Sequence, residues 1–215
     1  MKKYIKKIIG VVSISLLLVQ VIYVYSIEPR VVTAATATDA VVVTLTVDSG
    51  ISITSPTDVT MAPNISMSAN GSIGSATWNV KTNNTAGYTL AVKASASPAL
   101  VSGGNSFADY TEVAAGTPEL WSVPASNKEF GFSARGTRVN TTTWGTGADC
   151  GSAGAPNATL KYIGFETADR QISTSSTFTT TSGEDTVLCL AAEQDTVYAP
   201  SGTYTATITA TATTL

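Results

Sequence analysis

The sequence predicts an all-β fold that follows an N-terminal apolar helix. Apolar and polar residues alternate with period two in several runs between residues 40 and 212, as in strands with one buried face. Glycine, asparagine and proline separate these runs, and no run after residue 37 has helical periodicity. Many short alternating strands joined by turns are typical of an antiparallel β-sandwich of the immunoglobulin-like or jelly-roll-like kind.

Residues 1–37 have the composition of a targeting segment. Four lysines precede an unbroken apolar-to-neutral run over residues 8–25, and Ala35-Thr36-Ala37 fits the cleavage site of a signal peptide. The alternative is an uncleaved membrane anchor, since about 18 helical residues span roughly 27 Å. In both cases we expect export to the cell surface or the extracellular space, with the lysines on the inner side. The membrane is then contacted through this segment alone.

Residues 38–215 are expected to form a single domain, because their length suffices for one hydrophobic core. They carry 7 basic and 14 acidic residues, which give a net charge of −7. A surface this acidic binds phosphate backbones poorly. Nucleic acid is therefore not an expected partner.

Strands are expected at the start of this domain. In residues 41–47 the odd positions are Val, Val, Leu and Val, and residues 51–54 alternate briefly before Pro56. Residues 58–64 are expected to form an edge strand that Pro63 ends. The closing strand is expected over residues 202–212, where Tyr, Ala and Ile alternate with five threonines.

The element around which the rest of the predicted fold is arranged is a β-hairpin over residues 76–94. Both arms alternate, and Asn83-Asn84-Thr85-Ala86-Gly87 between them has the composition of a turn. We expect its apolar face to form the centre of the core. That face consists of Ala76, Trp78, Val80, Tyr88, Leu90, Val92 and Ala94.

Residues 95–158 are predicted to be a long, loop-rich excursion between core strands. Gly, Ser, Ala, Asn and Pro dominate it, and only residues 129–134 alternate well enough for a strand. One helical turn is expected near residues 106–113. Further strands are expected over residues 161–165, 174–181 and 186–190.

The sequence predicts no catalytic activity and no cofactor. It contains no histidine, which is the usual general base and the commonest zinc ligand. An enzyme would have to use carboxylates, as glycan hydrolases do, and this remains the least favoured alternative. No metal site is predicted, and the nearest approach to one is a calcium site. Its candidate ligands are Glu184, Asp185, Glu193 and Asp195.

The two cysteines, Cys150 and Cys189, are predicted to form a disulfide. In an exported protein a pair of cysteines indicates a bridge rather than a metal or redox site. The bridge would connect the end of the excursion to the strand at residues 186–190. The alternative is two unpaired buried thiols.

Two segments resemble the WxL cell-surface domains of bacteria. These are residues 87–92, Gly-Tyr-Thr-Leu-Ala-Val, and the ending 201–209, Ser-Gly-Thr-Tyr-Thr-Ala-Thr-Ile-Thr. Tyr88-Thr89-Leu90 lies where that family has its first Trp-x-Leu motif. The resemblance implies an exported β-domain that binds peptidoglycan or another surface glycan, with Tyr88 and Leu90 as contacts. The closing strand is also similar to that of secreted pilin-like coat proteins.

Trp121 and Trp144 of the excursion are further candidates for ligand contact, by stacking. For both tryptophans, and for Tyr88, the alternative is a place in the core. The function that we expect is that of an exported bacterial cell-surface protein with a structural or adhesive role. The first alternative is a self-associating subunit of a surface fibre or layer, formed by edge-strand pairing.

Overall fold

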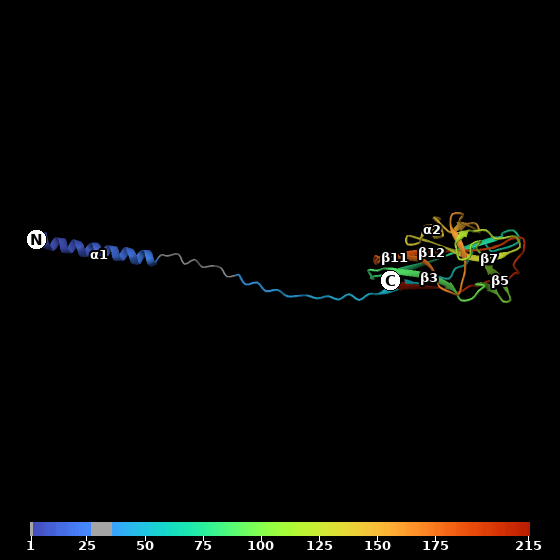
Figure 1. The fold of residues 1–215 in the computed structure, drawn as a ribbon, viewed down its shortest axis with the longest axis horizontal. Helices are drawn as coiled ribbons and strands as arrows, with labels where there is room; N and C mark the ends of the chain where they lie inside the picture. Colours follow the sequence, from blue (N-terminus) through green and yellow to red (C-terminus); the bar gives the residue numbers. More distant parts are fainter. Residues whose placement is uncertain (1, 27–35) are drawn as a thin grey trace. The chain divides into compact units, whose positions relative to one another are not determined.

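The computed structural model describes residues 2–26 and 36–215 (Figure 1). The chain divides into two compact units, Met1–Thr46 and Val47–Leu215, and each is described by itself. The first unit contains one helix, α1 (Lys2–Ser26). Ala35, where the predicted cleavage site begins, lies outside the described residues. Within the described ranges, no helix is both long enough and apolar enough to cross a membrane.

Residues 36–46 of the first unit have no regular secondary structure, although the sequence predicts a strand over 41–47. Their large apolar side chains are exposed: the exposed fraction is 86% for Val41, 85% for Val43 and 85% for Leu45. A strand needs a neighbour to receive its backbone hydrogen bonds. No strand among the described residues pairs with this segment.

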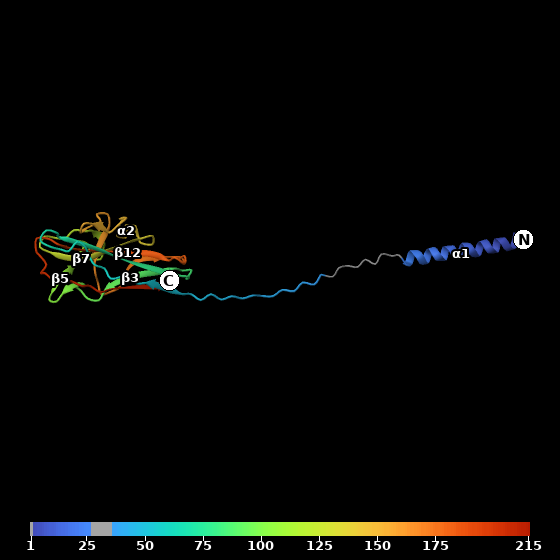
Figure 2. The same cartoon turned by 180° about the vertical axis from the view of Figure 1, so that it is seen from behind.

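The second unit is all-β, and all its strand pairs except one are antiparallel (Figures 1 and 2). Its largest sheet has eight strands, with β12 and β7 at the centre and β5 parallel to β7. The order along this sheet is β1 (Ile51–Thr54), β2 (Gly71–Thr82), β12 (Glu184–Gln194), β7 (Lys128–Gly136), β10 (Lys161–Gly164) and β6 (Glu119–Leu120), and β4 (Leu100–Ser102) joins it through β5 (Asn105–Asp109).

A second sheet has three strands, in the order β11 (Arg170–Ser175), β3 (Tyr88–Ala94) and β13 (Ile208–Thr214). A small pair, β8 (Gly151–Ser152) and β9 (Ala155–Pro156), lies apart from both sheets in the hydrogen-bond pattern. A four-residue helix, α2 (Thr141–Trp144), begins at Asn140, whose side-chain oxygen caps it by accepting from the backbone N–H groups of Thr142 and Thr143.

The prediction of a hairpin over residues 76–94 is wrong about which strands pair, but it is correct about which side chains are buried. β2 and β3 do not pair, because β2 belongs to the eight-stranded sheet and β3 to the three-stranded sheet. Residues 83–87 therefore form an arch that carries the chain from one sheet to the other. The alternating side chains of both arms are nevertheless buried, from Trp78 at 6% exposed to Tyr88 at 0%.

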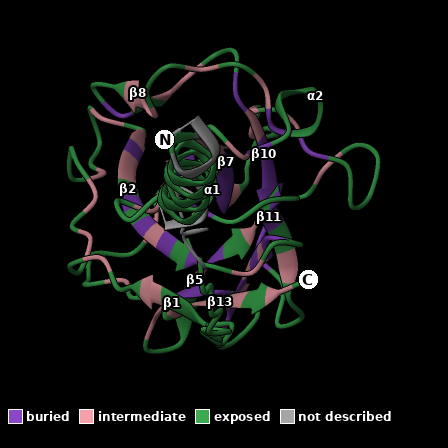
Figure 3. Ribbon diagram, turned by 90° about the vertical axis from the view of Figure 1, so that its left-hand side faces the viewer, coloured by how far each residue is buried: buried purple, intermediate pink, exposed green. Residues whose placement is uncertain are grey.

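Side chains from both sheets form one hydrophobic cluster, which is the main core. β12 and β7 contribute Leu188, Phe130 and Phe132, and β3 contributes its whole apolar face. Figure 3 shows buried residues along several strands of both sheets, among them β2 and β11. Along β13 intermediate and exposed residues alternate, and none is fully buried.

The predicted excursion over residues 95–158 is largely ordered. It contains β4 to β9, and one of these, β7, is a central strand of the eight-stranded sheet. The expected helical turn near residues 106–113 is wrong, since residues 106–109 belong to β5 and residues 110–113 form no helix. Residues 58–64 do not form the expected edge strand and make only an isolated bridge, between Ala62 and Ile73.

The outer face of β12 carries a second, smaller cluster. Cys189 and Ala191 lie on the face opposite Leu188 and Leu190, because alternate residues of a strand point to opposite sides. The predicted disulfide is confirmed: Cys189 is bonded to Cys150, with a Cα–Cα distance of 5.1 Å. Constraining residues 39 apart in sequence stabilises the folded state by about 4 kcal/mol in the chain-entropy account.

We expect the arch between the sheets to depend on Gly87. Its φ is +88°, and a Cβ there would collide with the backbone carbonyl oxygen of Ser175. Gly87→Ala should therefore lower the free energy of unfolding by at least about 2 kcal/mol. Gly104→Ala is the matched control, because nothing lies within 4 Å of a Cβ there. Urea unfolding measures both variants, and equal effects would contradict the assignment.

Candidate binding groove

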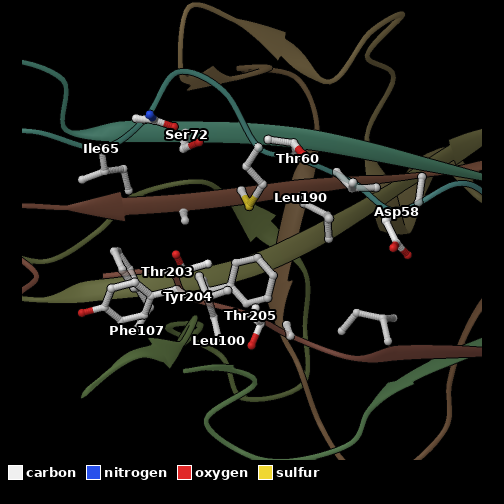
Figure 4. Close-up of a pocket in the computed structure, with 18 of the residues that line it drawn as sticks. Asp58, Thr60, Ile65, Ser72, Leu100, Phe107, Leu190, Thr203, Tyr204 and Thr205 are labelled. Carbon is white, nitrogen blue, oxygen red and sulfur yellow. The ribbon is translucent and has the colours of Figure 1, made fainter. Parts of the chain in front are cut away.

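An apolar groove of about 1350 Å³ opens along one side of the main core (Figure 4). One wall is the irregular segment of residues 55–67, and the other is the stretch of residues 199–210 that leads into β13. In Figure 4, Thr60 and Ile65 lie on one side, with Leu100 and Tyr204 across from them. The groove therefore separates the free side of β2 from the free side of β13.

The first wall runs alongside β2. It pairs with β2 only at the isolated bridge between Ala62 and Ile73, whereas β1, just before the wall in the chain, forms a regular pair with β2. Gly74 of β2 permits this close approach, since a Cβ there would lie 2.7 Å from Cγ1 of Val59 and 3.1 Å from Cγ of Met61. Pro56 and Pro63 interrupt the segment and remove two backbone donors. The wall consequently presents side chains, not a continuous strand edge.

The second wall has a half-buried apolar face. Tyr204 packs edge-on against Phe107, with ring centroids 5.2 Å apart and planes at 85°, and its hydroxyl donates to the Pro200 carbonyl at 3.0 Å. Ala206, Ile208 and Ala210 continue this face toward β13. Three small or medium side chains in a row leave space between this wall and the first.

The floor of the groove is the main core itself. Its apolar residues include Trp78, Phe130, Leu188 and Leu190. Nearly all the partly buried apolar residues that pack against the main core line this groove, with Ala212 the exception. The floor residues are themselves buried, so the apolar surface that stays partly exposed in the groove belongs to its walls.

Polar residues line the groove together with the apolar ones. Gln194 is buried at one end, where its Nε2 donates to the Ser66 carbonyl at 3.0 Å and its Oε1 accepts from the Ala199 N–H at 2.8 Å. This amide connects the two walls. Asp58 alone carries charge among the residues that line the groove. The site is therefore suited to an uncharged ligand surface.

Three of the predicted ligand contacts are core residues in this structure. Tyr88 and Leu90 are 0% exposed and Trp144 is 3% exposed. Trp144 packs against Phe132 with ring centroids 5.5 Å apart. The core alternative weighed for Tyr88 and Trp144 agrees with this burial, and none of the three side chains is accessible to an external ligand.

Trp121 belongs to the cluster on the outer face of the large sheet. It stacks on Tyr110 at 4.5 Å and meets Tyr162 edge-on at 5.3 Å, and its Nε1 donates to Oε2 of Glu193 at 2.6 Å. Burial raises the pKa of Tyr110 and of Tyr162 to about 12, so both phenols stay protonated at neutral pH. These rings act as a cover for the sheet.

The predicted calcium ligands do not converge. Glu184 and Glu193 lie near opposite ends of β12, separated by roughly 30 Å of extended strand. Glu184 binds Arg138 at 3.0 Å, and Oδ1 of Asp185 accepts from Asn79 at 2.7 Å. Among the described residues, no three His, Cys, Asp or Glu side chains gather as a metal site would require. The four weak calcium candidates therefore do not lie together in this arrangement.

Sequence reasoning missed the groove. The alternating residues of β2 and β12 predict the buried side chains of its floor. The walls give a weaker signal, because residues 55–67 form no strand and only the later part of residues 199–210 alternates. A usable signal was present in the first wall, where Val59 and Met61 lie between Pro56 and Pro63 and Ile65 follows the second proline. Apolar residues in a proline-rich, irregular segment indicate a chain that covers a core without joining its sheet.

No family model matches this chain, and no significantly similar protein is found among curated proteins or among solved structures. Functional inference for this chain therefore depends on its own geometry.

One buried carboxyl gives the fold a testable pH dependence. Glu129 of β7 is 1% exposed, and burial raises its pKa, while Asn127 Nδ2 donates to its Oε1 at 3.1 Å. A raised folded-state pKa stabilises the fold below the unfolded-state pKa, near pH 4.5, and this stabilisation is lost as the pH rises through the folded-state pKa.

Glu129→Gln should remove this dependence, because an amide can still accept from Asn127 and carries no charge. We expect the melting temperature of the wild type to fall relative to the variant between pH 4.5 and 7.5, as measured by circular dichroism. Asp58→Asn, at an exposed carboxyl, is the control. Parallel melting curves of the wild type and Glu129→Gln across this range would contradict the assignment.

Proposed function

We propose that this chain is an exported, non-catalytic structural protein of the bacterial cell surface. The observation that carries the proposal is the Cys150–Cys189 disulfide, because such bridges persist in oxidising compartments outside the cytoplasm. The lysine-flanked apolar segment at residues 2–25 agrees with export. Both features are typical of proteins that are exported from the cytoplasm.

The proposed body of this protein is an antiparallel β-sandwich. Its support is that the eight-stranded and three-stranded sheets contribute to one main core, with the arch at residues 83–87 connecting them. In such a body one face of each sheet is buried against the other. The outer face of β13, with its threonines, suits permanent contact with water.

A structural role is supported by what the carboxylates bind. Glu112 accepts from the Gly164 N–H at 2.6 Å, and Asp109 accepts from the Ala99 N–H at 2.9 Å. Asp149 accepts from Asn157 and from the Gly151 N–H, which holds its pKa below the ordinary value. These carboxylates fix loops by accepting local hydrogen bonds, a use that does not require a substrate.

The second candidate function is self-association into a surface fibre or layer. It is favoured over wall binding through the WxL-like motif, since Tyr88 and Leu90 are buried. The groove, and the exposed valines of residues 41–47, supply an apolar surface and an apolar segment on the same chain. Exposed apolar patches of this kind mark interaction sites.

Export predicts that lysines of the body are accessible from outside intact bacterial cells. A membrane-impermeant amine reagent should label Lys81 or Lys128, identified by mass spectrometry, without lysis. Thiol alkylation before and after reduction should show Cys150 and Cys189 bonded in the protein recovered from cells. Labelling that appears only after lysis, with two free thiols, would contradict export.

Self-association predicts concentration-dependent assembly of the purified chain, measured by sedimentation velocity. The sedimentation coefficient should increase with concentration, and it should do so without peptidoglycan. A chain that stays monomeric and pellets with purified peptidoglycan would instead support wall binding.

A further inference from the structure

We propose that residues 40–47 of one copy dock as an additional β-strand in the groove of a second copy, along residues 204–210. This inference rests on the proposed self-association and specifies its contact. Val41, Val43, Leu45 and Val47 would enter the groove, and Val42, Thr44 and Thr46 would face outward.

The donor segment has the composition of a strand but no partner within the described part of its own chain. Residues 40–47 are rich in β-branched side chains and contain no glycine or proline. All eight are exposed, including Val47 at 74%. Asp39 and Asp48 flank the run, and a charge at each end would keep those positions outside an apolar groove. An exposed, uncharged run of this kind pairs readily with an open strand edge.

The acceptor edge offers backbone groups. Thr205 exchanges backbone hydrogen bonds with Val101 at 2.9 and 3.0 Å, and the Thr207 carbonyl accepts from the Ser95 N–H at 3.0 Å. Odd-numbered residues therefore direct their N–H and C=O groups toward β4 and β3. In an antiparallel ladder, successive residues direct their backbone groups to opposite edges of the strand. The N–H and C=O groups of the intervening even-numbered residues therefore point toward the groove. Within residues 47–215 no strand forms a hydrogen-bonded pair with this edge, although β1 lies close to β13.

The other sheet edges are protected, which distinguishes this one. β1 has four residues and β6 has two, and short edges pair weakly. β11 carries Arg170 and a bulge between Gln171 and Ser173, and Thr174 N–H donates to the Arg138 carbonyl. The stretch of residues 204–214 has no charge, proline or glycine. Natural proteins leave such an edge open mainly where something pairs with it.

The side chains of the two partners are complementary. The acceptor places Ala206 and Ala210 on the groove side, where small residues leave room, and the donor supplies valines and a leucine. Eight donor residues in a strand extend roughly 26 Å, against seven residues of acceptor edge. Strand addition would therefore cover the partly exposed apolar residues of the groove walls while pairing the free backbone groups.

A second copy fits this contact better than the same chain. To reach its own groove, the donor segment would have to reverse direction at residues 48–50, just before β1. There Asn83 holds the chain: its Nδ2 donates to the Asp48 carbonyl at 2.7 Å, and its Oδ1 accepts from the Gly50 N–H at 2.6 Å. Each copy has one donor and one groove, so the contact is head-to-tail and continues from copy to copy.

Disulfide trapping in the full chain tests the contact. One preparation carries Ala206→Cys, and a second carries a single cysteine at position 42, 43, 44, 45 or 46. The two are mixed as monomers, concentrated and mildly oxidised. We expect covalent dimers, on a non-reducing gel, with Val43→Cys and Leu45→Cys at least about tenfold above those with Val42→Cys, Thr44→Cys and Thr46→Cys, because side-chain direction alternates.

Thr207→Cys replaces Ala206→Cys as the matched acceptor control, since Thr207 is exposed on the outer face. Each variant must first show the melting temperature of the wild type. Equal trapping at all five donor positions would contradict strand docking. A bridge that forms only within one chain, when Leu45→Cys and Ala206→Cys are combined, would overturn the choice of a second copy.

The outcome separates this inference from the proposed self-association. If the wild type assembles with concentration but no donor position is trapped, the docking contact is wrong and self-association stands. If the wild type stays monomeric at all concentrations and no dimer forms, both proposals fail.

Discussion

The structure depends on one constraint: two apolar strand faces joined by a five-residue connection share a single core while belonging to different sheets. Val80 ends one face and Tyr88 begins the other, and both are fully buried. The glycine at position 87, with its positive φ, lets the chain turn from one sheet to the other where a side chain would meet the backbone of Ser175. With β2 and β3 fixed in this way, β12 pairs with β2 and β7 on one side of the core, and β11 and β13 each pair with β3 on the other.

Period-two alternation predicted which side chains are buried but not which strands pair. The faces of residues 76–94 were predicted correctly, because alternation is a property of one strand and its environment. Two alternating strands joined by five residues have the same sequence pattern whether the connection is a hairpin turn or an arch between sheets. The strand that pairs with β2 could therefore not be deduced from the alternation. Its actual neighbour, β12, lies over a hundred residues later, and such pairings are set by the packing of the whole core.

The candidate site was less accessible to sequence reasoning than the fold. The groove has a floor of alternating strands and walls of irregular chain, and only the floor has a periodic pattern. The calcium candidates show the opposite error, since Glu184 and Glu193 are close in sequence but separated by the length of β12. The disulfide was predicted because two cysteines, in a chain expected to be exported, leave a single pairing.

The open side of the core and the unpaired N-terminal segment have a common physical origin. β13 and the residues before it hold β3 on one edge, and their alanines fill little of the space on the core side. Larger residues there would close the groove and would leave residues 40–47 without a complementary surface. The small residues on the β13 edge and the branched residues of the segment 40–47 are therefore complementary in shape. Each is unfavourable alone, because one leaves the apolar walls of the groove partly exposed and the other exposes the apolar side chains of residues 40–47 to water.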